Sequence, residues 1–309
     1  MDIVRYQPSF KDEWNAFVEH SKNGTFLLNR DYMEYHADRF TDASLMFFEK
    51  GRLLAVFPAS LHGDRIVSHG GLTYGGFVMD RSMTAQTMLR IMESLVCFLK
   101  GEGLKELSYK RVPSIYHSYP SDEDLYALFR HGATLSRCGI SSAIYLPEKI
   151  KYSNRRMRAI KKASQAGLRF QESHDFDSFI GLLSEVLIRH NVKPVHTAEE
   201  LALLASRFPH NIRLFMALRD DRMLAGSVVY ETPTVAHTQY LANSREGSTC
   251  GALDFVIDRL INEVYPDKLY LDFGISTEDG GQYLNEGLVE QKQEFGGRGI
   301  VYDEYWIRL

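Results

Sequence analysis

The stretch Leu269-Tyr270-Leu271-Asp272-Phe273-Gly274, together with the segment that follows it as far as Gly297, decides the predicted fold. Apolar residues alternate with other residues in this stretch, which is typical of a strand, and small residues then end the pattern. The run from Leu284 to Phe295 has helical apolar spacing and stops at a pair of glycines. An acid at a strand end before a turn and a helix is typical of ligand sites in open α/β sheets; an ordinary connection with a solvated Asp272 is the alternative.

Length and composition limit the class of protein. A chain of 309 residues is longer than one hydrophobic core usually grows, so we expect two domains. The net charge of −4 argues against general DNA binding and against binding to an anionic membrane surface. The three cysteines are far apart and the eleven histidines lack metal-ligand spacing, so we predict neither a disulfide framework nor a metal site. The sequence has no leader pattern and no long apolar run, so we expect a cytoplasmic protein without a membrane span.

Similar segments recur in the same order and at nearly the same spacing in the two halves of the chain. The hairpin-like segment Leu45–Ala59 resembles Phe215–Val229, and a helix followed by a strand occurs at 88–110 and again at 253–272. A third pair, 125–146 and 288–309, completes the order. A duplication explains this order, with chance resemblance of amphipathic elements as the alternative. We therefore predict an N-terminal domain over 1–149 and a C-terminal domain over 150–309, with the boundary close to Leu146–Tyr152.

A basic helix is predicted between the two halves, from Ser153 to Gly167. Five cations lie within the eight residues 155–162, although the chain as a whole is acidic. Arg155, Arg158 and Lys162 fall on one helical face by their spacing. We predict that these three residues bind an anionic group of the substrate, because cations and the arginine fork suit phosphate. A solvated helix face is the alternative.

The turn before the long helix of the second half is a predicted phosphate site. A glycine-containing turn at a helix that begins near Thr249 presents free amides and the positive end of the helix dipole. Plain N-capping by Ser248 or Thr249 is the alternative. The helix of the first half that begins near Thr84 has no comparable glycine turn, so only the second half is expected to bind the donor. The predicted cofactor-binding residues are Ser244, Gly247, Ser248, Gly251 and Ala252.

Three motifs in the last part of the chain resemble a known family. They are Asp272-Phe273-Gly274-x-Ser276, Leu284-Asn285-x-Gly287-Leu288 and Lys292-x-x-Phe295-Gly296. Together they resemble the closing motif of the FemAB-like branch of the GNAT superfamily of acyl-CoA N-acyltransferases. Upstream segments with Arg155-Arg156, and with His237 and Tyr240, resemble the same branch. The resemblance covers nearly the whole chain and implies an α/β (α+β) protein with two tandem GNAT-like folds, in which helices flank mixed sheets.

The resemblance implies an N-acyltransferase that moves an acyl group from acyl-CoA to an amino group of a sugar, lipid or peptide precursor, without a metal. In this chemistry the amine attacks the acyl carbonyl directly, so the site removes a proton, holds the oxyanion and protonates the leaving group. The predicted catalytic residues are Asp272, directly or through a water that it holds, as base and Tyr283 or Tyr240 as acid, with Tyr305 as a further candidate acid. The predicted substrate-binding residues also include Asn285 and Lys292. A packing role is the alternative for each tyrosine.

Two other functions stay open. One is a Fem-type aminoacyltransferase, which takes its donor from aminoacyl-tRNA. Such enzymes often carry a coiled-coil arm for tRNA, and the sequence has no heptad run that would form one, so acyl-CoA is favoured as the donor. A non-catalytic GNAT-like binding module is the third function, and the strand-end motif around Asp272 argues against it. Acyl-CoA is therefore the expected co-substrate, and tRNA is an alternative partner.

Overall fold

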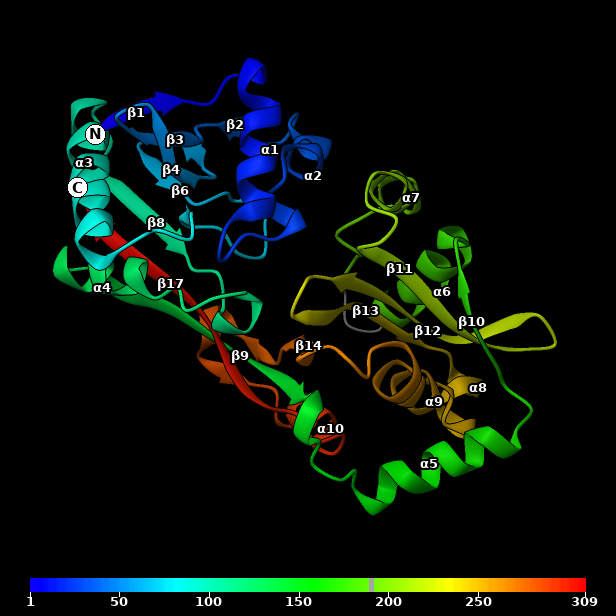
Figure 1. Cartoon of the computed structure of the whole chain (residues 1–309). Coiled ribbons are helices and arrows are strands. Elements are labelled where there is room, and N and C mark those ends of the chain that lie inside the picture. The colour runs from blue at the N-terminus through cyan, green and yellow to red at the C-terminus, as the bar shows by residue number, and fades with distance from the viewer. Residues whose placement is uncertain (189–191) are drawn as a thin grey trace. The chain divides into compact units, whose positions relative to one another are not determined.

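The computed structural model describes residues 1–188 and 192–309 (Figure 1). The chain divides into two compact units, each built from separate segments of the sequence. Unit 1 comprises Met1–Gly139, Glu278–Tyr283 and Val301–Leu309, and unit 2 comprises Ile140–Thr277 and Leu284–Ile300. His190, one of the histidines considered above for metal binding, lies outside the described residues.

The first part of the chain alternates strands and helices. Its elements are β1 (Asp2–Arg5), α1 (Lys11–His20), α2 (Arg30–Met33), β2 (Thr41–Asp42), β3 (Leu45–Glu49), β4 (Arg52–Phe57), β5 (Ser60–His62), β6 (Arg65–Val67), β7 (Val78–Met79), α3 (Ala85–Gly101), β8 (Glu106–Lys110), α4 (Glu123–Arg130) and β9 (Thr134–Tyr145). In unit 1, one sheet has the order β1-β3-β4-β7, and β8, β6, β5 and β2 follow one another in a second sheet.

The core of unit 1 lies between α3 and the strands. The hydroxyl of Thr84 accepts a hydrogen bond from the amide of Thr87 and so caps the start of α3. The buried stripe of α3 has helical spacing and consists of Met88, Ile91, Met92, Leu95 and Leu99. It shares one core with the aromatic side chains of Phe47, Phe57 and Phe77.

The second part of the chain repeats this alternation. Its elements are α5 (Asn154–Gln165), β10 (Arg169–Ser173), α6 (Phe176–Ile188), α7 (Ala198–Arg207), β11 (Ile212–Arg219), β12 (Arg222–Glu231), β13 (Val235–Asn243), α8 (Arg245–Cys250), α9 (Ala252–Arg259), a π-helical turn (Leu260–Val264), β14 (Tyr270–Ile275), β15 (Thr277–Glu278), β16 (Tyr283–Leu284), α10 (Glu286–Gln293) and β17 (Arg298–Arg308).

Helices cover both faces of the unit 2 sheet, whose strand order is β10-β11-β12-β13-β14-β9. Figure 1 shows α6 and α7 on one face and α5, α8 and α9 on the other. On the α9 face, Ala163 of α5 and Val256 of α9 share a core with Phe215 of β11. On the opposite face, a Cβ atom at Gly226 would lie 3.1 Å from the ring of Phe179, so this glycine lets α6 approach the sheet.

The two halves of the sequence share one order of elements, as the sequence predicts. Apart from β2, β5 and β6 in the first half and α5, β15 and β16 in the second, and with α8 and α9 counted as one helix, each has a strand, a pair of helices, a hairpin, a strand, a helix, a strand, a helix and a final strand. Both hairpin turns use left-handed residues, Lys50-Gly51 in one and Asp220-Asp221 in the other. The two halves thus share the conformation of the hairpin turn as well as the order of their elements. The predicted tandem arrangement is confirmed.

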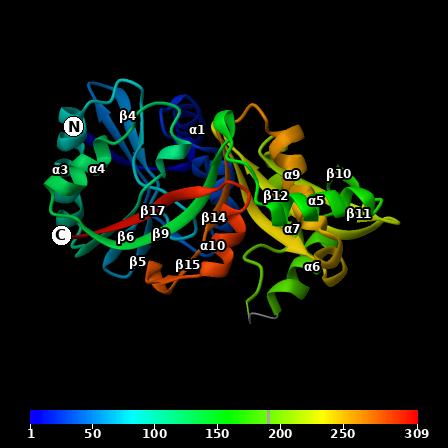
Figure 2. The ribbon, with the colours of Figure 1, turned by 90° about the horizontal axis from the view of Figure 1, so that it is seen from below.

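The last strand of each half of the sequence pairs with a strand of the other half. Residues 143–145 of β9 pair antiparallel with 270–272 of β14 in unit 2. Residues 304–308 of β17 pair antiparallel with 106–110 of β8 in unit 1. Figure 2 shows β9 and β17 side by side, and in unit 1 the Ser136 hydroxyl donates a hydrogen bond to the main-chain oxygen of Glu304 at 2.9 Å. Because of this exchange, the compact units differ from the ranges 1–149 and 150–309, whose boundary stays a prediction.

One predicted helix start is wrong. The helix expected to begin near Thr249 is preceded by α8, which begins at Arg245. The side chain of Ser244 caps α8 by accepting a hydrogen bond from the amide of Gly247 at 2.8 Å. Gly251, in a left-handed conformation with φ of 81°, then joins α8 to α9. The sequence offers three hydroxyl residues as caps in this segment, and the first of them starts the helix.

Candidate functional site

The parallel strands β13 and β14 part shortly after they meet. They pair only at Val235 with Tyr270, Ala236 with Leu271, and His237 with Asp272. Within the described residues no pairing between them follows, although β13 continues to Asn243 and β14 to Ile275. The edge of β13 beyond His237 therefore has main-chain N–H and C=O groups that are not paired to β14. An extended ligand can form hydrogen bonds with these groups.

His237 and Asp272, the last residues to pair, also contact each other through their side chains. Nδ1 of His237 lies 2.7 Å from Oδ2 of Asp272. Asp272 is 0% exposed, and its Oδ1 accepts a hydrogen bond from the hydroxyl of Ser141 on β9. The hydroxyl of Thr238 donates to the main-chain oxygen of Asp272 at 3.3 Å. The carboxylate is therefore held by groups from three strands.

The contact with Asp272 determines which ring nitrogen of His237 carries the hydrogen. An ionised carboxylate only accepts hydrogen bonds, so Nδ1 carries the hydrogen and Nε2 of the neutral ring is an acceptor. The His237 side chain is 14% exposed, and no hydrogen bond of its Nε2 occurs among residues 1–188 and 192–309. Asp272 is therefore enclosed, whereas Nε2 of His237 is an accepting nitrogen on the more exposed of the two side chains.

Gly274 keeps space beside the imidazole. Its φ is 75°, a left-handed conformation that glycine adopts at no steric cost. A Cβ atom there would lie 3.3 Å from Cε1 of His237. A larger residue would therefore strain the strand end and press on the ring.

Lys292 holds the turn after β14. Its ammonium group donates to the main-chain oxygens of Gly274 and Ile275 at 2.7 and 3.0 Å and to the hydroxyl of Ser276 at 2.8 Å. Burial lowers the pKa of Lys292 to about 8, although the nearby Asp272 acts in the opposite direction. An ammonium group has three donors, and these contacts use all three. Lys292 therefore positions the strand end, and its predicted contact with substrate would have to replace one of these bonds.

The other predicted substrate and acid residues have different surroundings. The side chain of Asn285 caps α10 by accepting from the amide of Leu288 at 3.1 Å. The hydroxyl of Tyr240 lies 2.6 Å from Nδ1 of His196, and burial raises the pKa of Tyr240 to about 12. Tyr283 and Tyr305 belong to unit 1, whereas Asp272 and Tyr240 belong to unit 2. Of the predicted catalytic residues, only Asp272 and Tyr240 lie in unit 2, and each contacts a different histidine.

The predicted cofactor residues form the start of α8 and its junction with α9. A Cβ atom at Gly247 would clash with the main-chain oxygen of Leu224, and one at Gly251 would lie 2.6 Å from that of Ala159. Packing alone therefore requires both glycines. Ser248 lies in α8 and Ala252 is fully buried at the start of α9. The amides of the first turn of α8, at Arg245 and Glu246, lack an intrahelical partner and can bind an anion.

The basic helix α5 contains cations in two environments. The guanidinium of Arg156 is buried, contacts Asp254 at 2.8 Å and Glu294 at 2.9 Å, and lies over the ring of Phe295. Arg155 is exposed and lies 3.5 Å from Glu294. The remaining cations, Arg158, Lys161 and Lys162, are exposed and form no ion pair within the described part of the chain. Arg156 therefore attaches the helix to α9, and the others face solvent.

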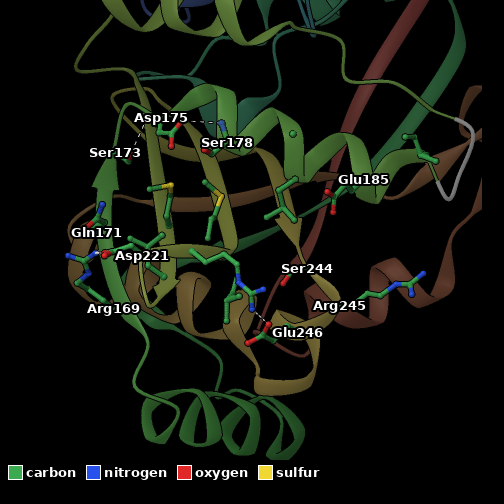
Figure 3. A pocket seen from close by; sticks show the side chains of 18 residues that line it. Arg169, Gln171, Ser173, Asp175, Ser178, Glu185, Asp221, Ser244, Arg245 and Glu246 are labelled. Atoms are coloured by element: carbon green, nitrogen blue, oxygen red, sulfur yellow. Dashed lines mark hydrogen bonds and ion pairs between the residues drawn. The ribbon is translucent and has the colours of Figure 1, made fainter.

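A separate pocket lies on the α6 face of the sheet (Figure 3). Its volume is about 1130 Å³. In the figure, Asp175, Ser178 and Glu185 lie on the α6 side and Ser244 and Glu246 on the opposite side. His237 and Asp272 do not line this pocket. This pocket is thus distinct from the place where β13 and β14 part.

The described residues contain no group of three or more histidine, cysteine or acidic side chains that could hold a metal ion. Among them there is also no helix with the length and apolar composition needed to cross a membrane.

Comparison with known proteins identifies the fold that carries this site. Residues 150–283 match the family model described as "Acetyltransferase (GNAT) domain". Residues 150–283 form a GNAT domain. This range contains His237, Asp272 and the pocket. The predicted GNAT resemblance is confirmed, and the protein is an acyltransferase.

Solved structures share the fold of the GNAT domain and of the remainder of the chain. FemX has 11% sequence identity and a TM-score of 0.71, covering 100% of this chain and 98% of its own. L-PGS from Bacillus licheniformis has 10% identity and a TM-score of 0.66, covering 98% of this chain and 92% of its own. A tandem GNAT protein from the clavulanic acid biosynthesis pathway has 12% identity and a TM-score of 0.52, covering 99% and 98%. No curated protein sequence matches the chain significantly. The predicted α/β architecture with tandem GNAT-like folds is therefore confirmed.

Sequence reasoning named Asp272 but not the role of His237. The two residues are 35 positions apart, and Ser141 is 131 positions from Asp272. His237 stood in the sequence as part of a family-like segment, without a partner. The missing signal is the register of β13 against β14, which decides that these residues meet.

Proposed function

We propose that this acyltransferase moves an acyl group from acyl-CoA to an amino group of a sugar, lipid or peptide precursor. The observation that carries the proposal is the contact of His237 with Asp272 at the point where β13 and β14 part. An amine is a nucleophile only after it loses a proton, and an imidazole oriented by a buried carboxylate is suited to accept that proton.

The proposed reaction needs only groups of this chain and the two substrates. Nε2 of His237 takes a proton from the amine as the amine nitrogen attacks the thioester carbonyl. The tetrahedral intermediate then breaks its carbon–sulfur bond, and the imidazolium returns the proton to the leaving thiolate. Asp272 stays ionised and stabilises the imidazolium while it exists. No covalent acyl-enzyme is required.

The shape of β13 supports acyl-CoA as the donor. Ser244 follows His237 by seven positions in the sequence, so the strand spans about 23 Å between the proposed base and the first turn of α8. An extended pantetheine arm can follow this edge, with its amides bonded to the strand. The first-turn amides of Arg245 and Glu246 suit the pyrophosphate at the far end. The predicted Ser244, Gly247, Ser248, Gly251 and Ala252 shape this end, with Ser244 and Gly247 nearest the helix start.

A second donor, aminoacyl-tRNA, is favoured by one observation. Arg158, Lys161 and Lys162 are exposed cations of α5 without ion pairs in the described residues, and they suit a polyanion. The fold likeness to FemX is consistent with the Fem-type alternative. The same cations, with Arg155, would serve an anionic small substrate in the first proposal. Acyl-CoA and aminoacyl-tRNA are both cytoplasmic donors, so we propose that the protein acts in the cytoplasm.

A donor comparison tests the proposal. The purified full chain is incubated with acetyl-CoA, longer acyl-CoAs or aminoacyl-tRNA and with a panel of amino sugars, amino lipids and peptides, and acylated product is measured by mass spectrometry. Product from an acyl-CoA that is lost in a His237→Gln variant supports the proposal. Product from aminoacyl-tRNA alone would replace acyl-CoA as the donor. Product that is undiminished in His237→Gln would remove His237 as the base.

A further inference from the structure

The floor of the pocket on the α6 face is apolar at strands β11 and β12, whereas polar and charged side chains make up most of the remaining lining. Its lining includes Leu182, Met216, Leu218, Met223 and Leu224. Met216 pairs with Gln171 on one side and with Gly226 on the other, so the sheet ladders use the main chain of the floor. A sugar or nucleobase placed there would lose hydrogen bonds to water without replacement, which is costly. An aliphatic chain forms no hydrogen bonds with water and so loses none on binding, and methionine side chains adapt to its shape.

Gly181 leaves room on the helix side of the pocket. It lies inside α6, where glycine is among the least favourable residues for helix formation. No heavy atom of the described chain lies within 4 Å of its Cβ position, so neighbouring protein atoms do not require a glycine. The space beside Gly181 is open to the pocket that it lines. A bound chain would occupy that space and account for the residue.

The rim carries charges of both signs, seen around the pocket in Figure 3. Arg169 pairs with Asp221 at 2.7 Å, and Arg222 pairs with Glu246. Two further rim residues, Glu185 and Arg245, have no hydrogen bond or ion pair among the residues that the structure describes. A head group with one positive and one negative charge can pair with both Glu185 and Arg245. A strongly anionic group would instead be repelled by the carboxylates of Asp175, Glu185 and Glu246.

We propose that this pocket binds a zwitterionic amphiphile, with its aliphatic chain over Met216 and Met223 and its head group at Glu185 and Arg245. The volume of about 1130 Å³ is that of a site for a large small-molecule ligand. His237 does not line this pocket, but Ser244, Arg245 and Glu246 belong both to its rim and to the proposed donor site at the start of α8. The proposal adds a lipid-like ligand to the protein, and its test uses the chain without acyl-CoA.

Binding is tested without turnover, by calorimetry on the full chain. The probes are alkylphosphocholines with chains of eight, ten and twelve carbons, each below its critical micelle concentration. Because each buried CH₂ adds a similar free energy, the Kd should fall about three- to fourfold per added CH₂. Gly181→Phe fills the space beside α6 and should weaken binding at least tenfold. An alkyl sulfate and an alkyltrimethylammonium of equal chain length should bind more weakly than the zwitterion.

Matched variants separate a site from general adsorption. Gly101 in α3 also has no heavy atom of the described chain within 4 Å of its Cβ position, so Gly101→Phe should leave binding unchanged. Met223→Gln puts a polar group on the floor at a partly exposed position and should weaken binding if Gly181→Phe fails to fold. A Kd that ignores chain length, or that is equal in wild type and both pocket variants, would overturn the proposal. Equal affinity for the singly charged probes would overturn the assignment of the head group.

Discussion

In the proposed reaction, His237 and Asp272 divide one task between a partly exposed group and a buried one. The imidazole presents Nε2, while the carboxylate is fully buried behind it and is held by Ser141. Substitutions of the buried Asp272 should therefore lower stability more than substitutions of His237, whereas both should lower kcat by similar factors. The residue scale is therefore where the proposed chemistry is most directly tested.

Replacing His237 by Gln removes the ring nitrogen that takes the proton. We expect kcat to fall by about 10² to 10⁴, because that is the usual contribution of a general base. The melting temperature should change little, since the side chain is partly exposed. Steady-state kinetics with thermal unfolding measures both. His210→Gln, at an exposed histidine, is the matched control and should keep full activity.

Asp272→Asn keeps the shape of the carboxylate but removes its charge. If Asp272 acts only through His237, the double variant with His237→Gln should be no slower than His237→Gln alone. The measurement is a double-mutant cycle on kcat/KM. Costs that add would mean that Asp272 reaches the substrate by a route that the buried position in this structure does not provide.

At the scale of an element, the turn between β14 and α10 depends on a buried cation. Lys292 satisfies the main-chain oxygens of Gly274 and Ile275, and these stay unsatisfied in Lys292→Met. We expect Lys292→Met to lower the free energy of unfolding at neutral pH by about 1 to 3 kcal/mol. Urea unfolding measures it. An unchanged midpoint would show that water replaces the ammonium group without cost.

The pH dependence of this contribution has a definite sign. The folded protein holds the pKa of Lys292 at about 8, below the ordinary value of 10.5, so the unfolded chain binds more protons between these values. The cost of burying the charge is fully present below pH 8 and is relieved as the pH rises towards 10.5. Wild type should therefore gain stability relative to Lys292→Met over that window. A constant difference between the two proteins across the window would contradict the lowered pKa.

The exposed face of α5 is a second element with a separable role. Arg155→Gln with Arg158→Gln should raise KM for an anionic substrate and flatten its salt dependence, because two screened attractions are lost. Stability should barely change, since exposed charges contribute little to folding. Arg65→Gln with Arg81→Gln, two exposed arginines of unit 1, is the charge-matched control. If both double variants shift KM equally, the effect comes from net charge and not from α5.

Elements could be predicted from the sequence wherever local pattern decides them. The strand at 270–275, the cap at Ser153 and the helix stop at Gly296 follow from alternation, hydroxyl capping and left-handed glycine. The start of α8 could not be predicted, because Ser244, Ser248 and Thr249 are equally good caps. The partner of β9 could not be predicted either, since β8 and β14 offer similar edges. The meeting of His237 with Asp272 depends on register between distant strands, which a local pattern does not contain.

At the scale of the whole molecule, the exchanged strands make each half of the sequence depend on the other. Residues 1–149 alone lack β17 and leave an edge of β8 open, and residues 150–309 alone lack β9 and with it Ser141. We expect each separately produced half to be unstable or aggregated, and co-produced halves to associate and regain activity. Size-exclusion chromatography and the acyltransfer assay measure this. Full activity from 150–309 alone would show that β9 is dispensable.

Both ends of the chain belong to unit 1, because β1 lies there and Leu309 donates its amide to the main-chain oxygen of Lys105 at 2.8 Å. Unit 2 is therefore, in mechanical terms, an insert that hangs from unit 1 by its internal crossings. A force applied between Met1 and Leu309 acts first on unit 1, and residues 301–309 lead from there directly into residues 284–300 of unit 2. The pairing of β17 with β8 is thus the contact that carries tension from the C-terminal end before it reaches the part of the molecule with His237 and Asp272.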